Sequence, residues 1–341
     1  MKLTPIILSL FLTACHAQAV VTTDTPSKTP IKLIVDTDLG NDIDDALALD
    51  IVYKAIDNGD AELLGIGNHK LSPTANTYID ILNTWYGYPN IPLAKSLTPV
   101  ENSHANDYTV QVCAITDSTG NYLYKRTKTE KDIENPTTMY RRLLASQPDS
   151  SVVFVSLGFG TELAKLLKST PDEISKLDGV SLINKKVKYL SIMAGSYGEK
   201  KRAEFNVIND IPAMQTVFDL WPTEIVQNPF ELGRLIQYPG EVIANNYTWA
   251  KHHPVVDGYV NYHKMPYDRA TWDLLSIVYV FKPELFSTSP RGVITVDDKG
   301  FTNFQPDENG KHVWLTSDNV DLTPIKDYII EVTTSIPQIY R

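Results

Sequence analysis

Short apolar runs alternate with segments of helical periodicity along most of the chain. Apolar runs that predict strands lie at 31–35, 62–66, 152–156, 187–193 and 224–227. Apolar positions at helical spacing predict helices at 46–55, 74–86, 161–168, 210–220 and 271–281. This alternation indicates an α/β fold in which helices flank a largely parallel central sheet.

The C-terminal part follows a different pattern. Residues 292–296 and 301–304 are separated by an Asp-Asp-Lys-Gly turn, which predicts a small β-hairpin region, and 312–315 predicts a further strand. Residues 102–135 are polar and weakly patterned, so we expect an excursion from the main fold rather than a separate domain.

The N-terminal segment has the features of an export signal. After Lys2, residues 3–12 are apolar but too few to span a bilayer. Two cleavage sites remain open, because the Leu-Thr-Ala-Cys run ending at Cys15 resembles a bacterial lipobox and Ala-Gln-Ala at 17–19 suits ordinary signal peptidase. We therefore expect a signal segment at 1–19, a Thr-, Ser- and Pro-rich tether at 20–30, and a catalytic domain at 31–341. The expected location is the periplasm or cell envelope, with a lipid anchor at Cys15.

Composition narrows the class of protein. The chain has 341 residues, of which 43% are hydrophobic and 21% charged, which is enough for a large core without disulfides. Its net charge of -10 argues against binding to a nucleic-acid backbone, which needs a basic surface. The second cysteine, Cys113, is predicted to be a half-buried thiol rather than a nucleophile.

An aspartate cluster is the sharpest feature of the sequence. Residues 36–45 read DTDLGNDIDD, so five carboxylates directly follow a buried strand and precede a helix. Ligands of parallel sheets bind at the carboxyl ends of strands, and Ca²⁺ would relieve the repulsion among the acids. A solvated helix cap is the alternative. An EF-hand does not fit, because Gly40 is misplaced and no Glu follows at the required spacing.

A strand followed by alternate aspartates also opens the haloacid-dehalogenase type of phosphatase. In that interpretation Asp36 is the nucleophile and Mg²⁺ is bound. Such enzymes are expected to have a small hydroxyl residue soon after the second aspartate, where this chain has Leu39 and Gly40.

Three further segments extend the aspartate signature. GFGTELA occupies 158–164, MAG at 193–195 is followed by AEFN at 203–206, and WD stands at 272–273. With DTDLG and DDALA at 36–40 and 44–48, these segments resemble, in order, those of the inosine-uridine-preferring nucleoside hydrolases, a family of calcium-dependent N-ribohydrolases. The aspartate and AEFN segments are the more specific ones.

The resemblance implies a calcium site and a general base. Asp38 would bind Ca²⁺ and take a proton from the attacking water, and Asp45 would be a bidentate ligand. Thr161 would contribute its backbone carbonyl, and Asp273 would complete the cage.

The resemblance also implies a sugar pocket. Asp44, Glu204 and Asn206 would bind sugar hydroxyls, and Met193 would line the pocket. Trp272 replaces the histidine that often precedes the late aspartate in this family. Its indole cannot act as an acid, so it would stack on the base or pack in the core.

Several positions depart from the family pattern. Two extra residues separate Gly40 from Asp44, GNHK at 67–70 replaces the usual Val-Gly-Asn loop, and Glu162 follows Thr161 in place of asparagine. Without a histidine before Asp273, His263 and Tyr267 are candidates for the acid that protonates the leaving base. These departures bear on substrate identity.

The sequence thus predicts an enzyme that hydrolyses the N-glycosidic bond of ribonucleosides or related ribosides. Its partner would be a small molecule, its cofactor Ca²⁺, and its membrane contact a lipid anchor alone. The resemblance is compatible with a homo-oligomer. The alternatives are the phosphatase and a non-catalytic lipoprotein that binds nucleosides or sugars.

Overall fold

The computed structural model describes residue 1 and residues 29–98, 100, 108–200, 202–318 and 320–341. The predicted signal segment, the lipidation of Cys15 and nearly all of the predicted tether lie outside the described residues.

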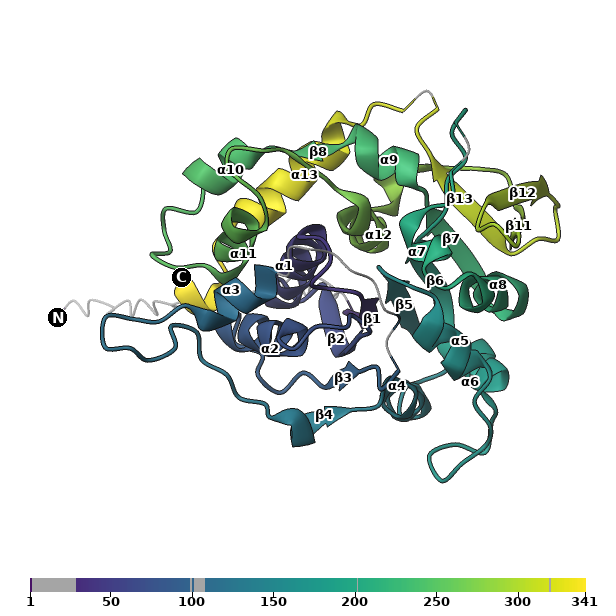
Figure 1. The fold of residues 1–341 in the computed structure, drawn as a ribbon, viewed down its shortest axis with the longest axis horizontal. Helices are drawn as coiled ribbons and strands as arrows, with labels where there is room; N and C mark the ends of the chain where they lie inside the picture. The colour runs from purple at the N-terminus through teal and green to yellow at the C-terminus, as the bar shows by residue number, and fades with distance from the viewer. Residues whose placement is uncertain (2–28, 99, 101–107, 201, 319) are drawn as a thin grey trace.

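A central sheet runs through the molecule in the order β12-β11-β13-β7-β6-β5-β1-β2-β3-β4, with β10 beside β13 (Figure 1). All neighbours from β13 and β7 through to β4 pair in parallel, which confirms the predicted α/β class. The strands are β1 Ile31–Thr37, β2 Ala61–Asn68, β3 Leu93–Lys95, β4 Ile133–Glu134, β5 Val152–Ser156, β6 Val187–Met193, β7 Glu224–Asn228, β10 Ser287–Thr288, β11 Gly292–Val296, β12 Thr302–Pro306 and β13 His312–Thr316.

Helices cover both faces of the sheet (Figure 1). They are α1 Asp44–Asp57, α2 Ala75–Trp85, α3 Tyr108–Ala114, α4 Pro136–Ala145, α5 Thr161–Leu167, α6 Gly179–Lys186, α7 Phe205–Ile208, α8 Ile211–Leu220, α9 Phe230–Leu235, α10 Gly240–Asn245, α11 Pro254–Tyr262, α12 Trp272–Phe281 and α13 Thr323–Thr334. A separate pair of strands, β8 Gln237–Tyr238 and β9 Arg269–Ala270, joins two of the connecting loops.

Two hydrophobic cores follow from the alternation of side chains along the strands. In β1, Leu33 and Val35 face the core that α1, α12 and α13 cover, whereas Ile34 faces the core under α4, α5 and α8. A strand with apolar neighbours on both faces has no polar side to show, which explains why the parallel strands appear in the sequence as unbroken apolar runs.

The predicted hairpin is confirmed as β11 and β12, and it extends the main sheet in antiparallel fashion beside β13. The described part of the polar excursion contains α3 and the short strand β4, which pairs with β3 at the edge of the sheet. The final helix, α13, was not expected from the sequence.

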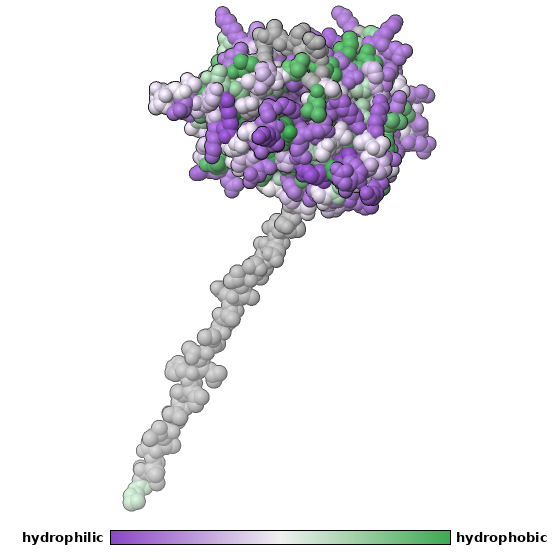
Figure 2. All heavy atoms as spheres, turned by 60° about the horizontal axis from the view of Figure 1, so that its bottom comes forward, coloured by the Kyte–Doolittle hydropathy of each residue, from purple (hydrophilic) through white to green (hydrophobic). Residues whose placement is uncertain are grey.

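The surface mixes the two kinds of side chain. Figure 2 shows hydrophilic residues over most of one face, with hydrophobic ones scattered among them. Exposed large apolar side chains belong to separate elements, for example Leu71, Val260 and Ile339. Within the described residues, none of the helices combines the length and the apolar character that crossing a bilayer requires.

Candidate active site

The aspartate loop connects the end of β1 to the start of α1. Gly40 makes the turn with a φ of 115°, a conformation that side chains disfavour. The loop places Asp38, Asp44 and Asp45 inside the protein, each no more than 4% exposed. The Asn41 side-chain amide donates to Asp38, and the Thr37 hydroxyl donates to Asp45. These bonds hold the carboxylates in place at the carboxyl end of the strand.

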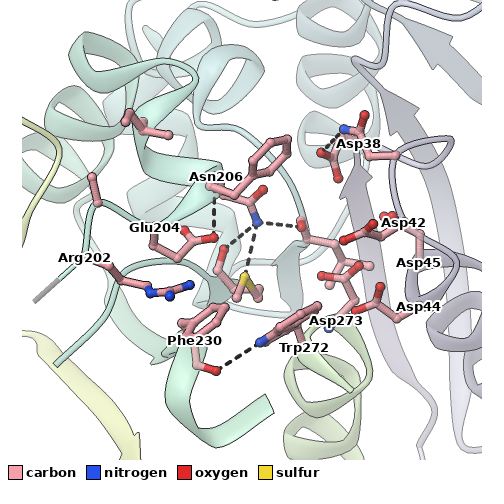
Figure 3. Close-up of a pocket in the computed structure, with 16 residues that line it drawn as sticks. Asp38, Asp42, Asp44, Asp45, Arg202, Glu204, Asn206, Phe230, Trp272 and Asp273 are labelled. Carbon is pink, nitrogen blue, oxygen red and sulfur yellow. Dashed lines mark hydrogen bonds between the residues drawn. The ribbon is translucent and has the colours of Figure 1, made fainter. Parts of the chain in front are cut away.

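A pocket of about 290 Å³ opens beside this loop (Figure 3). It is also bordered by the ends of β5 and β6 and by the starts of α7, α9 and α12, so segments far apart in the sequence meet there. Its lining residues are Asp38, Asn41, Asp42, Asp44, Asp45, Leu157, Met193, Arg202, Ala203, Glu204, Phe205, Asn206, Ile208, Phe230, Trp272 and Asp273. The structure therefore brings together eight of the nine residues predicted for the metal and substrate site.

Burial disfavours the ionised forms of three carboxylates that line the pocket, those of Asp38, Asp45 and Asp273. Burial raises the pKa of Asp38 to about 7, against the opposing effect of the Asn41 amide. Burial also raises the pKa of Asp45 well above its usual range, and the charge of Asp38 adds to the effect. Burial likewise raises the pKa of Asp273 well above its usual range, and among the neighbouring charges that of Asp45 contributes most. Such a cluster is electrostatically suited to a cation.

The donor set fits a hard cation. As the side chains stand, no three His, Cys, Asp or Glu groups of the described chain form a closed metal cage. However, Ca²⁺ sites are completed by backbone carbonyls and water, and one oxygen of Asp45, Oδ2, is buried without a hydrogen-bond partner. Unpaired buried carboxylate oxygens are costly, so a cation between Asp38, Asp45 and Asp273 would remove a real penalty.

Thr161 is the predicted ligand that the structure does not place in the pocket. Its hydroxyl donates to Asp210 at 2.6 Å, and its backbone begins α5, where helical geometry directs the carbonyl along the helix. The carbonyl of Leu157, which follows β5, lies at the pocket instead and accepts the Asn206 amide at 2.9 Å. A carbonyl has two lone pairs, so Leu157 can accept a second interaction.

Gly158 explains why β5 can end so close to the aspartate loop. A Cβ atom at this position would stand 2.8 Å from the Cβ of Asp38 and 2.8 Å from Nε2 of His69. Any side chain at this position would therefore displace the side chain of Asp38 or that of His69.

The AEFN segment forms the wall opposite the aspartates. Glu204 caps α7 and accepts the backbone N–H groups of Gly195 and Asn206, both at 3.0 Å. Burial nevertheless raises the pKa of Glu204 to about 7. The Asn206 amide donates to the carbonyls of Leu157 and Met193, which leaves its oxygen as the group available to a ligand. Met193 also lines the pocket.

Arg269 is a neighbour of the aspartates that the sequence did not reveal. Its guanidinium lies 3.1 Å from Oδ1 of Asp44 and 2.5 Å from Oδ2 of Asp42. Tyr262 donates to the other oxygen of Asp42 at 2.6 Å. Asp42, the additional acid of this loop, is thus held by Arg269 and Tyr262. Among the described residues, the second carboxylate oxygen of Asp44, Oδ2, accepts only the backbone N–H of Asp273, at 3.3 Å, and can make a further contact.

Trp272 packs rather than standing free. Its ring stacks on Phe230 with centroids 5.3 Å apart, and its indole N–H donates to the Phe230 carbonyl at 3.0 Å. Neither predicted replacement acid lines the pocket: His263 is exposed on the loop after α11, and the Tyr267 hydroxyl donates to the Tyr259 carbonyl at 2.7 Å.

Asp36 lies behind the pocket and not in its wall. It is fully buried, accepts a hydrogen bond from Tyr140, and has His69 at 3.6 Å. Burial lowers the pKa of His69 to about 3, so this imidazole is neutral. A substrate in the pocket cannot reach Asp36, which removes the geometric basis of the phosphatase hypothesis.

Comparisons with known structures agree with this architecture. A plant nucleoside hydrolase, PpNRh1, superposes with a TM-score of 0.68 at 18% identity, over 90% of this chain and all of that one. The inosine-uridine preferring nucleoside hydrolase of Bacillus anthracis gives 0.66 at 17%, over 89% and 99% of the two chains. The purine-preferring ribonucleoside hydrolase of Gardnerella vaginalis gives 0.68 at 17%, over 90% and 99%.

No curated protein matches the sequence. Residues 33–324, however, match the sequence pattern of a family described as inosine-uridine preferring nucleoside hydrolase, which covers most of the chain. The protein therefore belongs to the inosine-uridine preferring nucleoside hydrolase family.

Proposed function

We propose that this protein hydrolyses the N-glycosidic bond of ribonucleosides or closely related ribosides, with Ca²⁺ as cofactor and Asp38 as general base. The observation that carries the proposal is the meeting of Asp38, Asp45 and Asp273 with Glu204 and Asn206 around one pocket. An acid cluster facing polar groups suits a sugar, whose hydroxyls bind carboxylates and amides.

The residues divide the work between the two sides of the pocket. Asp38, Asp45, Asp273 and the Leu157 carbonyl would hold Ca²⁺, which when bound lowers the pKa of water and binds vicinal hydroxyls. Asp44, Glu204 and the Asn206 oxygen would orient the ribose. Asp38 would accept a proton at its carboxylate as water attacks the anomeric carbon, whose transition state has oxocarbenium character.

The direct test is incubation with nucleosides, with and without a calcium chelator, followed by assays for free base, reducing sugar and phosphate. Hydrolysis predicts base and sugar in equal amounts, no phosphate, and loss of both products on chelation. Saturable nucleoside binding without products would support the non-catalytic alternative and sink the proposal.

Asn206→Ala is expected to lower kcat/KM for a ribonucleoside by about 10-fold, because a hydrogen bond to the sugar is lost. A deoxy analogue that lacks the hydroxyl bound by Asn206 should lose less. Glu204→Ala should show the same selectivity with an added loss of stability, since Glu204 also caps α7. The matched control is Asn209→Ala, because Asn209 follows the same helix, bonds the Phe205 carbonyl and does not line the pocket. Equal losses on both substrates would place Asn206 outside the sugar contacts.

We also propose that the protein is exported and anchored by a lipid on Cys15. The basis is the Leu-Thr-Ala-Cys run after a short apolar segment. Cys15→Ala is expected to move the protein from the membrane fraction to the soluble fraction of the envelope. A soluble wild-type protein with a new N-terminus after Ala19 would favour the other cleavage site.

A further inference from the structure

Arg202 faces the pocket from the wall opposite the aspartates (Figure 3). Among the described residues that line the pocket it is the one cationic side chain, and the other charged side chains there are all acidic. Its guanidinium lies 3.9 Å from the centroid of the Phe230 ring. In the described part of the chain it has neither an ion pair nor a hydrogen bond, so its N–H groups are free for a ligand.

The Phe230 ring that Arg202 contacts is itself packed against further side chains. Phe230 is stacked on Trp272 at an interplanar angle of 25°, and the guanidinium of Arg269 lies 4.9 Å from the Trp272 ring. Arg202, Phe230, Trp272 and Arg269 therefore form a continuous series of ring and guanidinium contacts. A guanidinium stacked on an aromatic ring keeps its N–H edge available for acceptors in its own plane.

Under the proposed function, the aspartates and Asn206 would hold the ribose. The base would then lie against the remaining wall of the pocket, which includes Phe230 and Arg202. When water bonds to the anomeric carbon, the C–N bond breaks and its electron pair passes to the base nitrogen. Asp38 receives the proton of the water, and the base takes a proton from solvent after it departs. Negative charge therefore grows on the base near a cation that is already in place.

We propose that Arg202 binds the leaving base and stabilises this charge, and that the pocket selects 6-oxopurine nucleosides. The inference rests on the proposed function and names its substrate class. A guanidinium fork matches the adjacent O6 and N7 acceptors of an oxopurine. Adenine presents an amino donor beside N7, which would oppose the donors of Arg202. Uracil has no paired acceptors of this spacing on one edge.

The test compares wild type with Arg202→Gln and Arg202→Lys on inosine, 7-deazainosine, adenosine and p-nitrophenyl riboside, at saturating calcium. Arg202→Gln should lower kcat/KM for inosine by about 10²-fold, the effect of removing one charge-stabilising donor. The p-nitrophenyl riboside needs little help from the enzyme to release its leaving group. It should be cleaved faster than inosine by wild type, and its rate should fall much less in the variant.

Two further readouts separate recognition from mere structural disturbance. Wild type should prefer inosine over 7-deazainosine, and Arg202→Lys, which keeps the charge but not the fork, should lose this preference. The matched control is Arg291→Gln, because Arg291 pairs with Glu224 far from the pocket lining. Equal loss on all four substrates in Arg202→Gln, or no loss on inosine, would overturn the proposal.

Binding of free hypoxanthine, followed by tryptophan fluorescence or calorimetry, tests the inference without turnover. Hypoxanthine should bind wild type and the Arg291→Gln control about equally, and Arg202→Gln at least about 10-fold more weakly. Equal affinity in all three proteins would refute the role of Arg202. If wild type cleaved no riboside while hypoxanthine binding still depended on Arg202, the proposed hydrolysis would fail and the base site would stand.

Discussion

Asp38→Asn is expected to lower kcat/KM for ribonucleosides by about 10⁴-fold, the upper end of what a positioned general base contributes. Asparagine has nearly the same shape but cannot accept the proton of water. It also removes one charged oxygen from the proposed calcium ligands. Asp38 is 4% exposed and lines the pocket, so its carboxylate is shielded from bulk solvent and faces the space that the substrate would fill.

The substitution should leave the fold intact, because asparagine can still accept the Asn41 amide through its own oxygen. Asp219→Asn supplies the matched control, as Asp219 is exposed on α8 and remote from the pocket lining. Asp42→Asn is the informative comparison within the same loop. Asp42 is paired with Arg269 and is not among the proposed calcium ligands, so Asp42→Asn should lower kcat/KM far less than Asp38→Asn does. An Asp38→Asn enzyme within tenfold of wild type would assign the base to another residue.

The fold could be predicted where burial leaves a strong pattern. β5 is buried at every position, and its bounds coincide with the apolar run 152–156. The short edge strands β3 and β4 have three and two residues, too few for any periodicity to appear. α13 buries only Ile325, Ile329 and Thr333, about one residue in each turn, so burial leaves only a weak apolar pattern in its sequence.

The site could be predicted where its residues are close in sequence or match a motif. The aspartates of residues 36–45 could be found from their density, and Asp273 from the resemblance of its segment to the nucleoside hydrolase family. Arg202 and Phe230, which line the pocket, and Arg269, which pairs with Asp42 and Asp44, were missed because their positions depend on how loops after different strands meet. Thr161 belongs to a recognised segment but does not line the pocket, because which residues reach it depends on where β5 ends and α5 begins; its role as a ligand stays a prediction.

Removal of calcium is expected to abolish hydrolysis and to lower the melting temperature. A ligand that binds only the folded state stabilises it by about 2.7 kcal/mol at 100 times its dissociation constant. For a chain of this size that free energy corresponds to about 4 °C. Calcium should therefore raise the melting temperature of the chelated protein in a concentration-dependent way, and magnesium should do so less, because it requires a tighter octahedral set of ligands.

Asp45→Asn is expected to change stability relative to wild type in opposite directions without and with calcium. Without calcium the variant should be at least as stable as wild type, because asparagine removes a buried carboxylate that Asp38 and Asp44 repel, while its oxygen can still accept the Thr37 hydroxyl. Calcium should raise the stability of the variant only a little and leave it below that of wild type, since the Asp45 carboxylate with its unpaired oxygen is gone as a ligand. Calcium-dependent melting curves of wild type, Asp45→Asn and Asp219→Asn measure both effects. If Asp45→Asn lost stability without calcium yet kept the full calcium shift, Asp45 would be a structural residue, and the cation would have to lie elsewhere in the pocket.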